Sequence, residues 1–395
     1  MIRAERRLGP KPLPHWYWRW VNWRLGEGYA KGHRGEAHFR PGQAPQRIER
    51  WSWQRLHLFL LARALGGGGG PVLSGGKTYG KAISYTRKRP AFTPRRTVNV
   101  SSASQLLAAI ANLQPGDLVK ATASFTVSNS SSPALTIKNR LSAPAEIDLS
   151  GVKLVYTGTQ QVNAVWLNNA SNLYIFGGDI STSDTGGVCL RVYGSQHVLW
   201  WGFTAHDCGA TGFQAQAIGG PVDHDDFQGT IWKVGQHLAW DPHTEAGTGL
   251  HAANLWDANQ TNAFTNNRFA FYAHDIPVGA CVEFGNNQPS SRATGNVLYL
   301  KCVDETDVAQ KQTGGNALQI WGDTNRLGLD VKYLEGKNLQ GFCLRTNGIS
   351  SGQTAKGVIV EYGRASNTNQ NPRYAGQGPW DSPGDVGYKR VRPAP

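Results

Sequence analysis

Methionine is nearly absent from the 395-residue chain, which contains one, and charged residues make up only 17% of it. Glycine, in contrast, occurs 48 times. This composition is typical of a β-rich protein with many tight turns and few helices. The length allows one large domain with a smaller appendage.

A hydrophobic segment long enough to cross a membrane is also missing. The only strongly apolar run, residues 56–65, is short and is interrupted by Arg63, so we interpret it as part of a small amphipathic helix and predict no membrane span. The start of the chain shows no recognisable signal peptide. We therefore expect an extracellular or virion-associated protein that leaves the cell by another route, such as lysis or as part of a virion.

The net charge of +13 is concentrated in the N-terminal quarter. Residues 1–96 hold 20 Lys and Arg against 4 Asp and Glu, whereas residues 97–395 hold 20 against 23. Tryptophans are interleaved with this basic charge, as in residues 15–23 (HWYWRWVNW). Such a segment suits an anionic polymer, a virion or a cell wall as partner. The alternatives are a small tryptophan core and, less favoured, nucleic-acid binding by residues 1–96.

Composition divides the chain into four parts. Residues 1–65 form a basic Trp-rich module, 66–96 a Gly-rich and basic linker, 97–368 the main domain, and 369–395 a C-terminal tail rich in Pro, Gly and Asn. At the start of the main domain, Ser102 and Gln105 form a capping box, which predicts a short helix over residues 106–113. We expect this helix to cover the open end of a solenoid core.

The main domain repeats a glycine-led pattern of alternating residues. Units of this length, unequal because their loops differ, predict a parallel β-solenoid. The layout resembles the pectate-lyase-like right-handed parallel β-helix family, which includes phage tailspikes, polysaccharide lyases and polyuronate epimerases. The resemblance implies an all-β fold and a polysaccharide substrate or receptor, with a homotrimer as one assembly. The copies start at Gly187, Gly212, Gly249, Gly279, Gly315 and Gly341, which are 25 to 37 residues apart.

The five cysteines show no Cys-x-x-Cys spacing, which argues against a zinc site. Cys189, Cys281 and Cys343 occupy one position of non-adjacent copies and are therefore expected to lie too far apart to pair. We expect free, mostly buried thiols and no disulfide framework.

Alternation within each copy predicts one row of polar residues on an outer face of the solenoid. Such a row is a candidate floor for a glycan, or simply the solvated face of a sheet. We expect Arg191, His251, Glu283 and Arg345 to bind substrate there. The full predicted row is Arg191, Gln216, His251, Glu283, Gln319 and Arg345.

The later strand of several copies ends in an acidic residue, and a His or Trp precedes three of these. Stacked at about 4.8 Å per coil, they predict an acidic ladder beside a sugar-cleaving cleft. The alternative is that each aspartate caps the next turn, which we favour for Asp179, Asp304 and Glu335. We expect Asp207, Asp241, His274 and Asp275 to be catalytic, and His206 and Trp240 to bind substrate.

Residues 240–245 (WDPHTE) form the most suggestive single site. The Asp-Pro-His tripeptide resembles the catalytic motif of mannuronan C5-epimerases, which implies that His243 transfers a proton and Asp241 orients or neutralises. That family has a tyrosine three residues before the aspartate, where this chain has Leu238. A second proton carrier is then needed from a neighbouring coil, with His206, His274 and Tyr272 as candidates.

A second acidic cluster consists of Asp223, Asp225 and Asp226. Hard oxygen ligands in a loop suit Ca²⁺, so these three are our candidate metal ligands. Paired carboxylates are also found in polygalacturonase-type hydrolases, although their Gly-His-Gly and Arg-Ile-Lys elements are missing here. A solvated loop is the third interpretation.

The sequence thus favours a polysaccharide lyase or glycosidase with its groove over the middle coils, and a polyuronate epimerase as a further option. The alternative is a non-catalytic phage tail or cell-surface protein in which the solenoid is a rigid rod. The fold hosts all of these roles and does not decide among them.

Overall fold

The computed structural model describes fifteen stretches of the chain, beginning at residue 89. The Trp-rich module, most of the linker and most of the C-terminal tail lie outside them, as do Trp240, Asp241, His243 and Asp304, so the predicted domain bounds stay predictions. The described residues are 89–128, 133–157, 163–182, 187–235, 251–256, 262–276, 279–285, 293–303, 315–321, 328–339, 341–347, 359–366, 368, 380 and 390–393.

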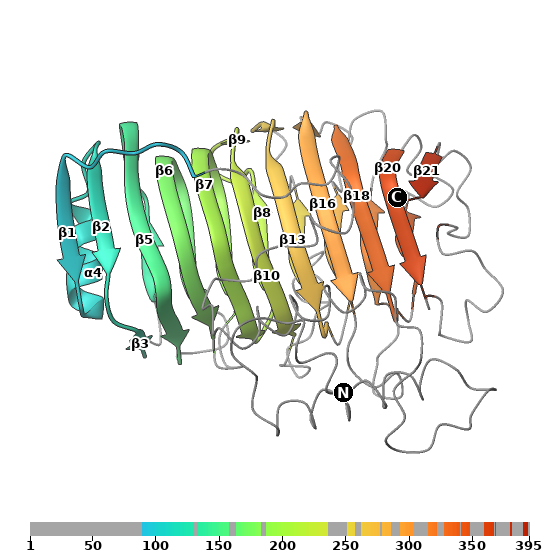
Figure 1. Ribbon diagram of the computed structural model, residues 1–395, viewed down its shortest axis with the longest axis horizontal. Coiled ribbons are helices and arrows are strands. Elements are labelled where there is room, and N and C mark those ends of the chain that lie inside the picture. The colour runs from blue at the N-terminus through green and yellow to red at the C-terminus, as the bar shows by residue number, and fades with distance from the viewer. Residues whose placement is uncertain are drawn as a thin grey trace, which may run out of the picture. The chain divides into compact units, whose positions relative to one another are not determined.

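This part of the chain is a right-handed parallel β-helix, as predicted (Figure 1). The strands of the described residues pair in parallel, each with the equivalent strand of the next coil. The first coils contain β1 (Arg96–Val100), β2 (Asp117–Ala121), β3 (Phe125–Val127), β4 (Leu135–Ile137), and the long strands β5 (Arg140–Tyr156), β6 (Val165–Ser181) and β7 (Leu190–Cys208).

In later coils, separate strands take the place of the long ones. The middle coils contain β8 (Phe213–Gln216), β9 (Val222–Asp223), β10 (Asp226–Val234), β11 (Ala253–Trp256), β12 (Phe264–Thr265) and β13 (Arg268–His274). The last coils contain β14 (Ala280–Gly285), β15 (Ala293–Thr294), β16 (Asn296–Val303), β17 (Asn316–Trp321), β18 (Leu329–Lys337), β19 (Leu344–Asn347), β20 (Ile359–Ser366) and β21 (Arg390–Pro393).

Two stacks of strands carry most of the polar side chains that were predicted to form a site. The opening sheet begins each coil and consists of β4, the first residues of β6 and β7, and then β8, β11, β14, β17 and β19. The closing sheet ends each coil and consists of β2, β5, the later residues of β6 and β7, and then β10, β13, β16, β18 and β20.

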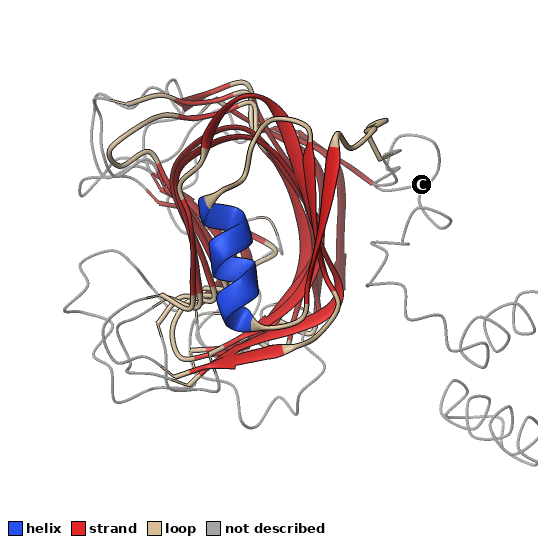
Figure 2. Cartoon of the chain, turned by 90° about the vertical axis from the view of Figure 1, so that its left-hand side faces the viewer, coloured by secondary structure: helices blue, strands red, loops and turns tan. Residues whose placement is uncertain are grey.

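The helix α4 (Ala103–Ala111) covers the open end of the core (Figure 2). It begins after Ser102, whose hydroxyl accepts a hydrogen bond from the backbone N–H of Gln105, while the Gln105 side chain accepts one from the N–H of Ser101. This reciprocal capping fixes the start of the helix. Leu106 and Ile110, four residues apart, are buried against the first coils. The predicted capping helix is therefore confirmed, three residues earlier than expected.

The corner between the two sheets is built from residues with left-handed backbone conformation. Asn172, His197, His224 and Asn266 have φ values of 55–57°, and small polar side chains are the ones that tolerate this region best. The next residue in later coils is a buried amide. Asn267 Oδ1 accepts a hydrogen bond from the backbone N–H of Asp225, and Asn296 Oδ1 accepts one from that of Asn267. These bonds satisfy backbone donors that the turn would otherwise leave unpaired.

The end of the predicted linker contacts the outside of the closing sheet, while most of its residues remain exposed. Arg89 forms an ion pair with Glu146, and its guanidinium lies 3.8 Å from the centre of the Phe176 ring. Phe92 makes an edge contact with Tyr174. In the part of the chain that is described, no helix is both long and apolar enough to cross a membrane.

The expectation of free thiols is wrong for four of the five cysteines. Cys189 is bonded to Cys208 and Cys281 to Cys302, and only Cys343 is a buried free thiol. Each bond joins the start of the opening sheet to the end of the closing sheet within one coil. The chain returns almost to its starting point after a coil, which leaves the Cα atoms only 5.6 and 6.0 Å apart. A comparison of equivalent positions in different copies misses such pairs.

Candidate functional site

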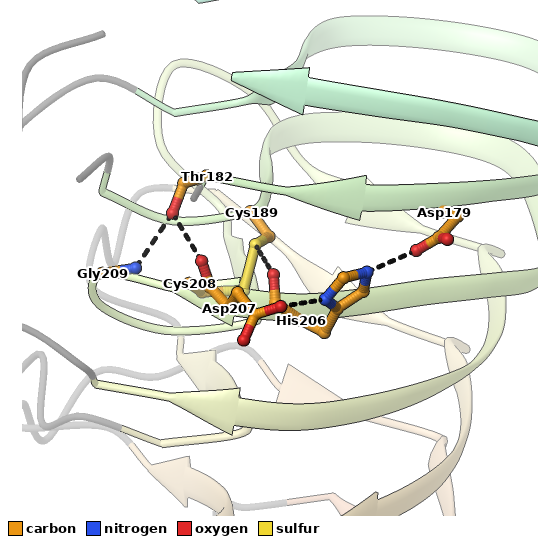
Figure 3. The surroundings of a disulfide bond; sticks show 7 residues. All are labelled: Asp179, Thr182, Cys189, His206, Asp207, Cys208 and Gly209. Carbon is orange, nitrogen blue, oxygen red and sulfur yellow. Dashed lines mark hydrogen bonds and ion pairs between the residues drawn. A yellow bond between two sulfur atoms is a disulfide. The ribbon is translucent and has the colours of Figure 1, made fainter. Parts of the chain in front are cut away.

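His206 stands between two carboxylates at the end of the closing sheet (Figure 3). Its Nε2 lies 2.6 Å from Asp179 Oδ1 on the preceding coil, and its Nδ1 lies 2.6 Å from Oδ2 of its neighbour Asp207. The backbone here is also fixed. The Thr182 hydroxyl donates to the carbonyl of Asp207 at 3.1 Å, and the sulfur of Cys189 lies 3.6 Å from the His206 carbonyl oxygen.

The electrostatics of this group favour a protonated imidazole. Burial works to lower the pKa of His206, but hydrogen bonds and attraction from Asp179 and Asp207 outweigh it, so the pKa lies above its ordinary value. The hydrogen bond to His206, against the effect of burial, lowers the pKa of Asp179. Because both ring nitrogens are engaged, His206 is held as a fixed cation and has no nitrogen left for a substrate proton.

An aromatic stack runs along three coils on the outer face of the closing sheet. The indole of Trp232 lies between the imidazoles of His206 and His274, with ring centroids 4.6 and 5.7 Å apart and planes within 11° and 7° of parallel. Both faces of the indole are therefore covered, and only its edge faces solvent. The register of β10 with β7 and β13 produces this stack.

His274 differs from His206 in that only one of its ring nitrogens is hydrogen-bonded to a described residue. Its Nδ1 lies 2.9 Å from Asp275 Oδ2, and its Nε2 has no hydrogen-bond partner among the residues that the structure describes. With Nδ1–H donating to the carboxylate, Nε2 is the basic nitrogen of the neutral ring. Tyr272 stacks beside it at 5.1 Å, and the Lys301 ammonium lies 5.5 Å from the Tyr272 ring. This arrangement can accept a proton from a bound substrate.

The predicted acidic ladder is wrong at its middle rung. The register places Trp232 between His206 and His274, where the sequence suggested Trp240. Lys233 then falls between Asp207 and Asp275, and its backbone N–H donates to the Asp275 carbonyl at 3.2 Å. All three have left-handed φ values, of 48°, 47° and 51°. The strand that closes this coil is β10, which ends at Val234, before the residues that were predicted to close it.

The other predicted members of the ladder differ in the contacts that their side chains make. Glu335 is buried and accepts a hydrogen bond from the Tyr333 hydroxyl at 2.7 Å, as expected of a structural residue. Asp179, also expected to be structural, pairs with His206 on the next coil. No sequence pattern indicates this contact, because Asp179 pairs in register with Thr204, two residues before His206. Asp304 and the Asp241–His243 motif lie outside the described residues, and their roles stay predictions.

The predicted polar row is displaced in two coils. Arg191, Glu283, Gln319 and Arg345 share one row of the opening sheet, but Gln214 and Asn254 occupy the rungs predicted for Gln216 and His251. His251 lies nearby. Its Nδ1 accepts a hydrogen bond from the backbone N–H of Ala280 at 2.9 Å, and its Nε2 lies 3.0 Å from Glu283 Oε2.

The three candidate calcium ligands point to different surroundings. Asp225 is fully buried and binds the Ser195 hydroxyl and the Val198 N–H, and burial raises its pKa to about 8. Asp223 binds Thr265 and His224, whereas Asp226 accepts from Gln228. In the described ranges, no group of three or more His, Cys, Asp or Glu is arranged to hold a metal ion. The calcium interpretation therefore gains no support.

No profile of a known protein family and no curated protein sequence matches the chain. Among solved structures, an alginate lyase from Paenibacillus sp. str. FPU-7 is 14% identical, with a TM-score of 0.40, over 70% of this chain and 96% of that one. The pectate lyase Pel9A is 11% identical, with a TM-score of 0.45, over 70% and 77%. ORF18 of Geobacillus virus E2 is 10% identical, with a TM-score of 0.34, over 88% and 65%. Similarity at this level carries no conclusion about activity.

Proposed function

We propose that the chain cleaves an acidic polysaccharide by β-elimination, with His274 as the base. The observation that carries the proposal is the hydrogen bond between His274 Nδ1 and the Asp275 carboxylate, in which Nδ1–H donates and Nε2 is left as the basic nitrogen. In the proposed step, Nε2 removes the proton from C5 of a uronate ring. The electron pair of that C–H bond forms the C4–C5 double bond, and the glycosidic oxygen on C4 leaves with a proton.

The surroundings of His274 support this chemistry. Lys233 and Lys301 come from the coils on either side of His274, and their ammonium groups would balance the sugar carboxylate, which makes its C5 proton more acidic. Tyr272, on the same outer face as His274, is the candidate acid for the leaving oxygen. His206 would act as a fixed positive charge and a support for Trp232.

Hydrolysis is less well supported by the same residues. Asp207 and Asp275 lie two coils apart, about 10 Å by the spacing of strands, which is near the upper end of the separation found in inverting glycosidases. Asp207 is, however, bound to His206 and lies 4.0 Å from the Lys233 ammonium. A carboxylate held in these two contacts is not free to protonate a glycosidic oxygen.

A second candidate function is a non-catalytic rod in a phage tail or cell-surface fibre that binds a polysaccharide receptor. The coverage of both faces of Trp232 favours it, because the stack then serves to hold coils together rather than to receive a sugar ring. The two disulfides favour an oxidising, extracellular or virion-associated setting under either function. A homotrimer would suit the rod.

An activity screen with matched variants tests the proposal. The full chain is incubated with polygalacturonate, alginate, a sulfated glycosaminoglycan and a neutral glucan, while the ultraviolet absorbance of unsaturated uronates and the appearance of reducing ends are followed. We expect elimination on a uronate polymer and a loss of about 10²-fold or more in kcat for His274→Ala. Asp275→Asn should lower kcat as well, because it no longer selects the tautomer.

The control is His224→Ala, which removes a half-exposed histidine that is also paired with an aspartate but lies at the other corner of the coil. Its activity should match that of the unaltered chain. Full activity in His274→Ala would remove His274 as the base. Reducing ends without unsaturated products would favour hydrolysis, and no activity on any of the polymers would favour the non-catalytic rod.

A further inference from the structure

Four side chains form a row on the opening sheet, and the proposed elimination does not use them. The register places Trp166, Arg191, Gln214 and Asn254 on four consecutive strands, β6, β7, β8 and β11. Their side chains are on the outer face of the sheet, since the residues on either side of each face the core. We refer to these four residues as the amide row.

Three atoms of the amide row are buried without a hydrogen-bond partner. They are Trp166 Nε1, Gln214 Nε2 and Asn254 Oδ1, which form part of a small set of such atoms in the described chain. Gln214 and Asn254 have no exposed surface at all. Because a buried polar atom without a partner is costly and uncommon, three in one row indicate a place where a partner binds.

The orientation of both amides is determined by their other contacts. Gln214 Oε1 accepts a hydrogen bond from Arg191 Nε at 2.6 Å, and a flipped amide would set two donors against each other. Asn254 Nδ2 points to Glu283 Oε1 at 3.5 Å, and its flip would set oxygen against a carboxylate. The unpartnered atoms are thus a donor on Gln214 and an acceptor on Asn254.

A hydroxyl group is the single partner that would satisfy both this donor and this acceptor. The two residues lie on adjacent strands, about 4.8 Å apart, and a hydroxyl can accept from Gln214 Nε2 while donating to Asn254 Oδ1. Trp166 Nε1 offers a further donor two strands away. Repeated donors and acceptors along a row suit a chain that carries many hydroxyl groups.

Arg191 adds a positive charge in the same row. Its Nε is used by Gln214, its guanidinium lies 5.0 Å from the Tyr193 ring centre, and its terminal amino groups have no partner among the described residues. A guanidinium edge of this kind binds carboxylates and sulfates. We propose that the amide row is a second, non-catalytic binding site for a sugar chain with an anionic substituent, whose hydroxyl group bridges Gln214 and Asn254.

Access to the site is from one end. Trp166 and Arg191 are half-buried, whereas Gln214 and Asn254 are fully buried. The ligand therefore meets Arg191 first, and its binding must displace whatever covers the two amides. An enclosed water molecule would satisfy the same atoms and is the occupant that the experiment has to distinguish.

The test is direct binding by calorimetry to the full chain carrying His274→Ala, so that the probe is not consumed and the result does not depend on catalysis. The probes are hexagalacturonate, a sulfated chondroitin hexasaccharide and cellohexaose. We expect binding of at least one anionic probe and much weaker binding of cellohexaose. Gln214→Met, which keeps the size of the side chain, should weaken binding about tenfold, and Trp166→Phe several-fold.

The matched control is Trp201→Phe, which removes an equally unpartnered indole N–H on the closing sheet and should leave affinity unchanged. Thermal unfolding checks that each variant is folded. If Gln214→Met does not fold, Trp166→Phe and hydrogen exchange of β8 and β11 with and without probe replace it, with slower exchange expected on binding. No binding of any probe, or equal affinity in all variants, would leave enclosed water as the occupant and overturn the proposal.

Discussion

The imidazole of His206 lies parallel to the indole of Trp232, with 4.6 Å between their ring centroids. The charge on that imidazole is held from three directions, by Asp179, by Asp207 and by the face of the indole. A cation so held makes the stability of the fold depend on pH. The raised pKa of His206 means that this contribution is complete below the ordinary histidine pKa and is lost as the pH rises through the folded value.

We therefore expect His206→Gln to be less stable than the unaltered chain at pH 6, by about 2 kcal/mol. The difference should shrink at alkaline pH, as His206 loses its proton. It should also shrink in acid, as the pH falls through the lowered pKa of Asp179. Thermal unfolding from pH 3 to 9 measures the difference in stability on both the alkaline and the acid side. A constant difference across that range would contradict a charged His206, and His224→Gln serves as the control at an exposed histidine.

The buried carboxyl of Asp225 also makes the fold less stable as the pH rises, and its effect begins at a lower pH than that of His206. Its buried carboxyl keeps a proton up to about pH 8 in the folded chain, whereas the unfolded chain releases it near pH 4. The folded state thus binds more protons in between, and stability falls as the pH rises, by at most about 1.4 kcal/mol per pH unit.

Asp225→Asn should remove this slope while still accepting the hydrogen bond from the Val198 N–H. Unfolding by denaturant at a series of pH values between 5 and 8 measures it. Asp223→Asn is the control from the same turn, because its lowered pKa affects stability only in acid. If both variants show the slope of the unaltered chain, Asp225 is ionised in the folded state.

The two disulfides should each stabilise the fold by about 3 kcal/mol, given the length of chain that they close. The double variant Cys189→Ala, Cys208→Ala is expected to lower the melting temperature and to loosen the strand end that carries His206 and Asp207. Thiol titration of the denatured chain should find one free thiol without reductant, that of Cys343, and five with it. Five thiols in the unreduced chain would show that neither bond forms.

The fold could be predicted from the sequence because a solenoid repeats its pattern, whereas the register between coils could not. The glycine-led copies at Gly279 and Gly315 share one offset, so the predicted positions of Glu283 and Gln319 are correct. In the copy at Gly212, Phe213 lies opposite Leu190 of the copy at Gly187. The number of residues from the glycine to the paired position therefore differs by two between these copies. Backbone hydrogen bonds between coils decide this offset, and no local pattern in one copy contains that information.

The candidate site could be predicted only in part, for the same reason. His206, Asp207, His274 and Asp275 lie at equivalent strand ends, and the repeated Ala-His-Asp triplet identifies them. Trp232 and Lys233 lie on the coil between these two triplets. They were missed because the strand of that coil ends before residues 237–241, which resemble the triplets in sequence. The contact from Asp179 to His206 depends on the reach of two side chains across neighbouring strands, and sequence spacing does not encode it.

Lys233 separates the carboxylates of Asp207 and Asp275, and its replacement tests whether that separation matters. Lys233→Asp would build the continuous acidic ladder that the sequence suggested, with three carboxylates at steps of about 4.8 Å. Like charges on adjacent strands repel, so we expect a loss of roughly 1 kcal/mol for each neighbour at pH 7. The loss should vanish near pH 3, where the carboxyl groups become protonated.

Lys233→Asn, which suits the left-handed backbone at this position, is the control and should be as stable as the unaltered chain or more so. Equal stability of the Asp and Asn variants at pH 7 would mean that the side chains at this corner point apart, and that Lys233 has no electrostatic role between the two aspartates.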